Sequence, residues 1–270
     1  AYENGYTPFS TGCQILIGDG LKGTDEQIVP IDGEYVKEAK IGRAVMDADI
    51  VISLTHFKAH ECTGIGGAIK NLGMGCGSRA GKMEMHSAGK PFVDRSLCVS
   101  CGMCFKNCAH GAISFPGKKA QIDHDKCVGC GRCIGVCPAD AVQAAQDEAF
   151  DILNRKMSEY AWAVVKDRPG FHVSLVLDVS PFCDCHPEND VPIVPDVGIF
   201  ASFDPVALDT ACADAVNGQP VLPDSLLARR GAEEKDHFHA LHPDTNWRVG
   251  IEQAVKMGMG SAEYELVEIE

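Results

Sequence analysis

Apolar residues follow two patterns along the chain, and these predict alternating strands and helices. Strands are predicted where the apolar run is nearly continuous, and they cover residues 14–17, 49–54, 172–177, 197–201 and 264–269. Helices are predicted from apolar residues at three- and four-residue steps or from a capping signal. Three of them cover residues 34–46, 64–72 and 147–166. A fourth begins at Asp204 and Pro205, and a fifth contains Trp247, Ile251 and Val255. This alternation favours an α/β fold with an open, mostly parallel sheet and helices on both faces.

Polar residues follow most of the predicted strands. They are Asp19, His56, Asp178 and Asp204. Because parallel strands end at one edge of a sheet, where ligands bind, we expect these side chains to converge on a cofactor or small-molecule site. For Asp204 the alternative, which we favour, is a helix cap in front of Pro205.

An internal cysteine repeat interrupts this pattern. The spacing Cys-x2-Cys-x2-Cys-x3-Cys begins at Cys98 and recurs 29 positions later at Cys127. Each half predicts a strand, a ligand loop, a short helix and a second strand. We therefore expect a small α+β bacterial ferredoxin-like domain over residues 90–146, inserted into an α/β domain formed by residues 1–89 and 147–270.

The cysteine spacing predicts two [4Fe–4S] clusters. Three sulfurs from one tight loop bind one cube, and the fourth sulfur points away and completes the other cube. The two ligand sets are Cys98, Cys101, Cys104 and Cys137 for the first cluster, and Cys127, Cys130, Cys133 and Cys108 for the second. Pro138 follows the last cysteine as the pattern expects, whereas Ala109 stands at the related position of the first half. A pair of zinc knuckles is the alternative, but zinc sites use two separated pairs of ligands.

The composition agrees with cluster binding in a reducing compartment. The 270-residue chain has 14 cysteines and a formal net charge of −14. Metal-ligand spacing in a long chain favours a cytoplasmic protein over a disulfide framework. The acidic charge argues against nucleic acid and favours a basic redox partner protein, and no apolar run reaches the length of a membrane span. Because the chain opens on Ala1, we expect an N-terminal part to be lacking.

Two histidines and a lysine surround a glycine-rich segment after the predicted strand 49–54. The glycines that open the predicted helix are Gly64, Gly66 and Gly67. Free backbone N–H groups at a helix start favour an anion. With His56, His60 and Lys70, they predict a site for a small carboxylate or phosphate-bearing ligand, in which the histidines act as acid, base or ligand. The alternative is that the histidines only cap or pack.

A third cysteine segment is a candidate metal or redox site. It comprises Cys183, Asp184, Cys185 and His186, and His60 and His86 are candidates to complete the ligand set. The alternative is a buried free cysteine, which is common in proteins. The histidines at 237, 239 and 242 are expected in a solvated turn.

Two segments, taken with the cysteine repeat, resemble the Fe–S centre proteins of domain of unknown function 362. They cover residues 56–75 and 196–209. The resemblance extends over nearly the whole chain and implies an α/β domain with a two-cluster ferredoxin insert, mainly in anaerobes. A shorter likeness to lactate racemase covers His60, Lys70 and the glycines between them. In that family such residues line a site for a nickel-pincer cofactor and substrate.

Three functions follow from these patterns and stay open at this stage. An oxidoreductase would pass electrons through the clusters to or from the anionic ligand. A ferredoxin-like carrier would use the α/β domain only as a docking platform. A redox or metal sensor would use the segment around Cys183.

Overall fold

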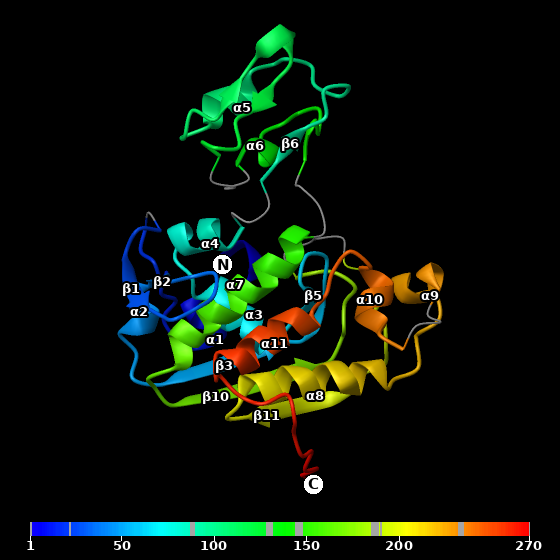
Figure 1. Ribbon diagram of the computed structural model, residues 1–270. Coiled ribbons are helices and arrows are strands. Elements are labelled where there is room, and N and C mark those ends of the chain that lie inside the picture. The colour runs from blue at the N-terminus through cyan, green and yellow to red at the C-terminus, as the bar shows by residue number, and fades with distance from the viewer. Residues whose placement is uncertain are drawn as a thin grey trace.

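The computed structural model describes residues 2–21, 23–86, 90–127, 132–143, 148–184, 189, 191–231 and 235–269. It is a mixed α/β structure of small sheets and short helices around one longer helix, α7 (Glu148–Val165) (Figure 1). Within these residues, no helix combines the length and the apolar character that a membrane crossing requires.

The largest sheet has three strands in the order β11–β10–β3. They are β3 (Val51–His56), β10 (Gly170–Val176) and β11 (Gly198–Ser202). β10 runs parallel to β3, with Leu175 opposite His56. β11 runs antiparallel to β10, with Ser202 opposite His172, so the expectation of parallel strands is wrong for β11. A strand parallel to β10 would need a crossover connection, usually a helix, that brings the chain back to the edge where β10 begins. The described residues between β10 and β11 contain no helix.

Helices cover one face of this sheet (Figure 1). α3 (Ala68–Lys70) and α8 (Pro205–Asn217) pack against β10, and α8 also packs against β11. Ser53 and Thr55 of β3 are buried, whereas the alternate residues Ile52 and Leu54 are 69% and 68% exposed. The helices expected on the second face are therefore not found within the described part of the chain.

Three other predictions differ from the structure. They concern residues 14–17, 34–46 and 264–269. Neither terminal run forms a strand. In place of the expected helix, strand β2 (Glu38–Gly42) pairs with β1 (Glu26–Pro30), and only one helical turn, α2 (Arg43–Met46), follows. Ala39 and Ile41 are both buried, and this spacing of two is that of a strand.

The glycine-rich segment begins as a β-hairpin, which shortens the helix expected there. β4 (Lys58–His60) pairs with β5 (Gly64–Gly66), and α3 continues into a π-helical turn, η2 (Asn71–Gly75). Gly64 has a φ of 77°, and a Cβ there would come within 2.9 Å of Trp247 Cβ. The turn therefore requires glycine at this position.

The remaining helix predictions are confirmed. α7 matches the expected segment, Asp204 caps α8 in front of Pro205, and α11 (Arg248–Lys256) covers the last predicted helix. The shorter helices of the body are η1 (Tyr2–Asn4), α1 (Pro8–Thr11), α4 (Arg79–Met85), α9 (Leu226–Arg230) and α10 (His237–Leu241). The expectation of a solvated turn at 237–242 is wrong, because His237 and His242 are buried beside the main core.

The cysteine repeat forms a separate small unit that lies apart from the body (Figure 1). Its elements are β6 (Phe92–Val93), α5 (Met103–Asn107), β7 (Ile113–Ser114), η4 (Pro116–Lys118), β8 (Gln121–Ile122), α6 (Arg132–Gly135) and β9 (Val142–Gln143). β6 pairs with β9 and β7 pairs with β8, both antiparallel. Each half thus has the order strand, loop, helix, strand, and the pairing joins the two halves.

Candidate functional site

Four cysteines from the two halves of the repeat line one hollow. They are Cys98, Cys101, Cys104 and Cys137. The first three come from the loop before α5 and from α5 itself, and the last follows α6. Phe115 and Val142 are among the apolar residues of the wall. Its cavity volume is about 10 Å³, so the four residues close around a small space. The sulfurs therefore group as the crossed spacing pattern predicts.

The thiols of this hollow lie close enough to affect one another. The backbone N–H of Ala120 donates to Cys98 Sγ and lowers the pKa of that thiol. Burial raises the pKa of the Cys104 thiol, and the sulfurs of Cys101 and Cys137 raise it further. A metal cation binds cysteine as the thiolate and displaces the thiol proton. A group of thiols that lie this close together is therefore suited to bind a metal cation.

The last cysteines of the two halves have matching surroundings. Ala112 N–H donates to Cys108 Sγ at 3.4 Å, and Ala141 N–H donates to Cys137 Sγ at 3.3 Å. Hydrogen bonds of this kind to cysteine sulfur tune iron–sulfur clusters. The repeat in sequence is thus a repeat in local geometry as well.

The structure describes only part of the second set of four cysteines. Cys108, Cys127 and Cys133 belong to the described residues, whereas Cys130 lies outside them. Cys108 and Cys133 pack against the same small core as Cys137. No disulfide joins two of the cysteines that the structure describes. An all-sulfur donor set fits iron–sulfur clusters, which are held by thiolates.

Charged groups gather where β3 and β10 end and β4 begins. His56 Nδ1 lies 2.9 Å from Asp184 Oδ1, and its Nε2 lies 2.9 Å from the carbonyl oxygen of Leu177. The buried Lys58 places Nζ 3.0 Å from Asp184 Oδ2. His56 and Lys58 therefore hold residues 177–184 against the end of β3 and the start of β4.

His60 is a buried, neutral hydrogen-bond donor. Its Nδ1 accepts the N–H groups of Cys62 at 3.1 Å and Thr63 at 3.3 Å, which places the ring proton on Nε2. Burial, followed by the ammonium of Lys70, lowers the pKa of His60 to about 3. Donor atoms of His60, Glu61 and Cys62 lie within 4.8 Å of one another. In this arrangement, however, neither ring nitrogen offers a lone pair to a metal.

The structure brings Lys70 together with Cys183. Lys70 Nζ lies 3.8 Å from Cys183 Sγ, and the Cys183 N–H donates to Glu61 Oε2 at 3.4 Å. An ammonium beside a sulfur repels a metal cation and attracts an anion. The surroundings of Lys70 therefore favour anion chemistry over a metal.

The candidate third metal site is described only in part. Cys185 and His186 lie outside the described residues. His86 is exposed at the end of α4, where its Nδ1 lies 2.7 Å from the carbonyl oxygen of Lys82. Cys183 is thus the one cysteine of the set that the structure describes, and its neighbour is the ammonium of Lys70.

Asp209 of α8 occupies the start of α3. Its Oδ1 accepts the N–H of Ala68 at 2.7 Å, and its Oδ2 accepts the N–H of Ile69 at 2.9 Å. A Cβ at Gly67 would lie 2.4 Å from Oδ1, so only glycine fits there. Two N–H groups at the start of α3 are therefore already bonded to a side chain of the same protein. Sequence reasoning missed Asp209, although an acidic residue amid the apolar positions of α8 is a usable signal.

Burial decides the protonation of Asp209. It raises the pKa of the carboxyl group to about 7, although the two backbone N–H groups act in the opposite direction. The site thus contains a carboxyl group that titrates near neutral pH.

The other strand-end residues do not all converge. Asp178 follows β10 and stays at the edge where His56 ends β3. Asp204 lies at the opposite edge, because β11 runs antiparallel. Asp19 follows no strand, and its Oδ2 accepts the N–H of the first residue of α4 at 3.0 Å. The predicted convergence is therefore wrong for Asp19 and Asp204.

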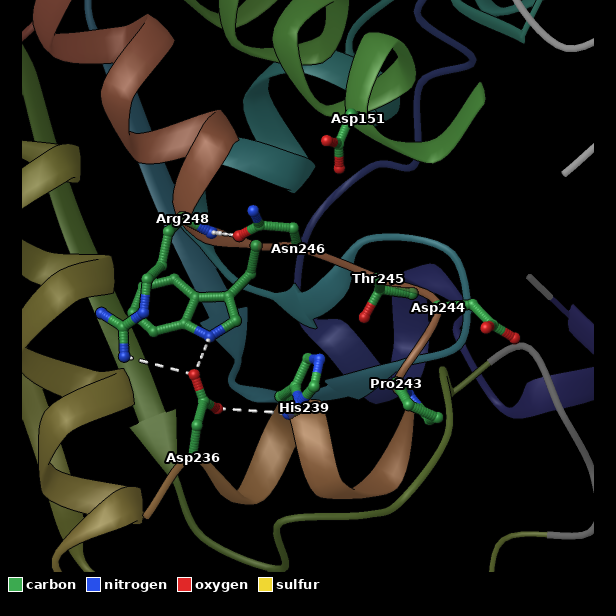
Figure 2. A pocket seen from close by; sticks show the side chains of 9 residues that line it. Asp151, Asp236, His239, Pro243, Asp244, Thr245, Asn246 and Arg248 are labelled. Carbon is green, nitrogen blue, oxygen red and sulfur yellow. Dashed lines mark hydrogen bonds and ion pairs between the residues drawn. The ribbon is translucent and has the colours of Figure 1, made fainter. Parts of the chain in front are cut away.

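A wider hollow of about 650 Å³ lies beside α10 and the start of α11 (Figure 2). Asp151, Asp236, His239, Trp247 and Arg248 are among its lining residues. Asp236 Oδ2 accepts Trp247 Nε1 at 3.0 Å and Arg248 Nη2 at 3.2 Å. The Arg248 guanidinium carbon stands 4.2 Å from the centre of the Trp247 ring. These bonds hold α10 against α11, and sequence reasoning gave no sign of the hollow.

One comparison with known proteins identifies a family. A search of curated proteins found no match. The model of the family DUF362, Domain of unknown function (DUF362), matches residues 1–214. The match includes the cysteine repeat, the hairpin with His60, Lys70 and Asp209. Because it spans well over half of the sequence, this chain belongs to the DUF362 family.

Proposed function

We propose that this chain is an iron–sulfur redox protein that passes electrons through two [4Fe–4S] clusters. The observation that carries the proposal is the position of Cys137, which lines the same hollow as Cys98, Cys101 and Cys104. Residues 90–146 would then be a ferredoxin-like module inserted in the α/β body. A zinc site would need two separated pairs of ligands, whereas this hollow takes three from one loop and helix and one from the other half.

The cysteines of the module would form two sets of cluster ligands. The first set is Cys98, Cys101, Cys104 and Cys137, and the second is Cys127, Cys130, Cys133 and Cys108. When bound, each cluster exchanges one electron at a time. The apolar residues Phe115 and Val142 line the wall beside the first set, and the backbone N–H of Ala141 donates to Cys137 Sγ, which would stabilise the charge on that sulfur.

Iron analysis of an anaerobically purified Cys137→Ser variant tests the crossed assignment. The unaltered protein should hold about eight irons and eight sulfides per chain, and the variant about half of each, because one set loses a ligand. Cys13→Ser, at an exposed cysteine outside the repeat, is the matched control and should keep the full content. A colourless protein without sulfide, or a Cys137→Ser variant with full content and unchanged spectra, would rule the assignment out.

We further propose that the electrons go to or come from a small anion held by Lys70 and His60. Among the described residues, the ammonium of Lys70 forms no ion pair with a carboxylate, and it donates a hydrogen bond to Cys183 Sγ. The neutral ring of His60 carries its proton on Nε2, which lies 3.7 Å from Glu61 Oε1. Two donors of this kind are suited to a carboxylate or a phosphate group.

Calorimetric titration with lactate and with inorganic phosphate tests this anion site. Lys70→Met should weaken the binding of whichever anion binds by about tenfold, since it removes the ammonium of the proposed site. Lys37→Met, at a lysine whose side chain is 71% exposed, removes the same charge and should leave the binding unchanged. If neither anion binds the unaltered protein, the body has no such site.

A ferredoxin-like electron carrier is the second candidate function. The observation that favours it is Asp209, which already bonds two N–H groups at the start of α3. The carrier function predicts intact clusters and no anion binding. The same titration therefore separates the two candidates.

A further inference from the structure

Charge is divided unevenly between the cysteine unit and the body. Residues 90–146 contain seven lysines and arginines against four aspartates and no glutamate, which is a formal charge of +3. Because the whole chain has a charge of −14, the remaining residues have −17. The acidic charge that predicts a basic partner therefore belongs to the body. Bound clusters would add negative charge inside the unit, but a partner protein meets the side chains of its surface.

The hollow of the first cysteine set reaches the surface of the unit. Cys101 is exposed, and Val99, which lines the same hollow, is 64% exposed. A cluster held there would lie beside the loop that leads into α5. Figure 1 shows α5 on the part of the unit that is farther from the body. A protein that docks on α5 therefore meets the unit and not the acidic body.

Exposed apolar side chains come from this loop and from α5. They are Leu97, Val99, Met103 and Phe105. Phe105 is 55% exposed, and its ring centre lies 6.2 Å from that of Phe115, which lines the hollow. Aromatic and methionine side chains are enriched where proteins bind proteins. The composition of this surface is therefore that of a protein docking site.

Three exposed cations border the apolar side chains. They are Arg95, Lys106 and Lys118. Arg95 Nη2 donates to the carbonyl oxygen of Pro116 at 3.2 Å, and Ser100 Oγ donates to the carbonyl oxygen of Lys118. These bonds hold η4 against the ligand loop, and Lys106 belongs to α5 itself. The cations therefore surround the loop that contains Cys98 and Cys101.

Carboxylates are fewer around the first set. Asp94 is the only acidic residue of the first half, residues 90–122, and its Oδ1 accepts the N–H and the hydroxyl of Ser96. Asp140 is exposed between two alanines of the wall of the hollow. Against these two carboxylates stand the three exposed cations and Lys119, whose ammonium donates to the carbonyl oxygen of Cys98.

We propose that this surface, formed by Arg95, Leu97, Val99, Phe105, Lys106 and Lys118, docks an acidic one-electron carrier protein. Opposite charge attracts and orients such a partner. One electron then passes from the reduced carrier to the oxidised first cluster, and no bond or proton changes with it. Charges more than about 10 Å apart are screened at about 0.1 M salt, so this surface decides and not the charge of the body. The inference rests on the proposed function, since it requires that cluster.

Calorimetric titration of the holoprotein with an oxidised plant-type [2Fe–2S] ferredoxin, which is an acidic carrier, tests this surface. The ferredoxin should bind the unaltered protein at about 0.1 M salt and more weakly as the salt rises, because salt screens the attraction. Lys106→Glu should weaken the binding by about tenfold. Lys37→Glu makes the same change at an exposed lysine of the body, is the matched control and should leave the Kd unchanged.

Lys118→Glu is a second variant of the same surface, and it decides if Lys106→Glu loses iron. The salt dependence of the unaltered protein needs no variant at all. A ferredoxin that does not bind, that binds more tightly as the salt rises, or that binds both variants as tightly as the unaltered protein overturns the inference.

Two further measurements separate the remaining outcomes. Sedimentation of the holoprotein alone tests whether the acidic body of a second copy occupies the surface. Self-association that Lys106→Glu abolishes would assign the surface to that copy and overturn the inference. Iron and sulfide are counted in each sample. Their absence from the unaltered protein contradicts the proposed function itself, whereas a protein with both clusters that does not bind the ferredoxin contradicts only the docking.

Discussion

Asp209 shows how one buried side chain changes what a glycine-rich segment can bind. It lies on α8, and its carboxylate reaches Ala68 and Ile69 across a sequence separation of 141 and 140 residues. Free N–H groups at a helix start are a general anion site. Here the side chain of Asp209 already accepts two of these N–H groups, so the binding of an external ligand depends on Lys70 and His60.

The raised pKa of Asp209 makes the stability of the fold depend on pH. The pKa of about 7 in the folded chain lies above the ordinary aspartate value of 3.8, so the folded state keeps a proton that the unfolded state releases. The stabilising contribution of this proton is complete below about pH 4 and is lost as the pH rises to about 7. Buried histidines with lowered pKa, such as His60, act in the opposite direction, so a variant must isolate the effect.

Urea unfolding of Asp209→Asn and of the unaltered protein provides that comparison. Between about pH 5 and 7, the free energy of unfolding of the unaltered protein should fall relative to the variant, by up to about 1.4 kcal/mol per pH unit. Asp214→Asn, at an exposed aspartate of the same helix, is the control and should follow the unaltered protein. Parallel curves for Asp209→Asn and the unaltered protein would contradict the raised pKa.

At the level of secondary structure, bonds between distant segments override local periodicity. Glu159 of α7 is fully buried and accepts the N–H groups of Glu34 at 2.7 Å and Val36 at 2.7 Å. With these donors engaged, the segment does not start the helix that its apolar pattern predicts, and β2 pairs with β1 instead. α7 itself was predictable because its periodicity extends over 18 residues.

In the whole molecule, the cysteine unit and the body have separate cores of very different size. The buried residues of the unit are Cys98, Cys104, Ile113, Ala120, Ala141 and Val142. Its strands have two residues each. A core of this size supplies little stability, so metal ligation should provide most of the folding free energy of the unit.

Hydrogen exchange before and after removal of iron tests this dependence. Loss of the clusters should expose the amides of residues 90–143 to rapid exchange, while the amides of β3 and β10 stay protected by the main core. Cys13→Ser keeps its clusters and should show the protected pattern throughout. Continued protection of the unit without iron would show that its own packing suffices.

The sequence by itself determined the features that depend on short spacings. The cysteine repeat, the long helix α7 and the cap of α8 by Asp204 are of this kind, because their geometry is set within a few residues. Only the tertiary structure decided the direction of β11, the contact of Asp209 with α3 and the pairing of Lys70 with Cys183. These depend on which distant segments meet when apolar surface is buried, and no local pattern records that choice.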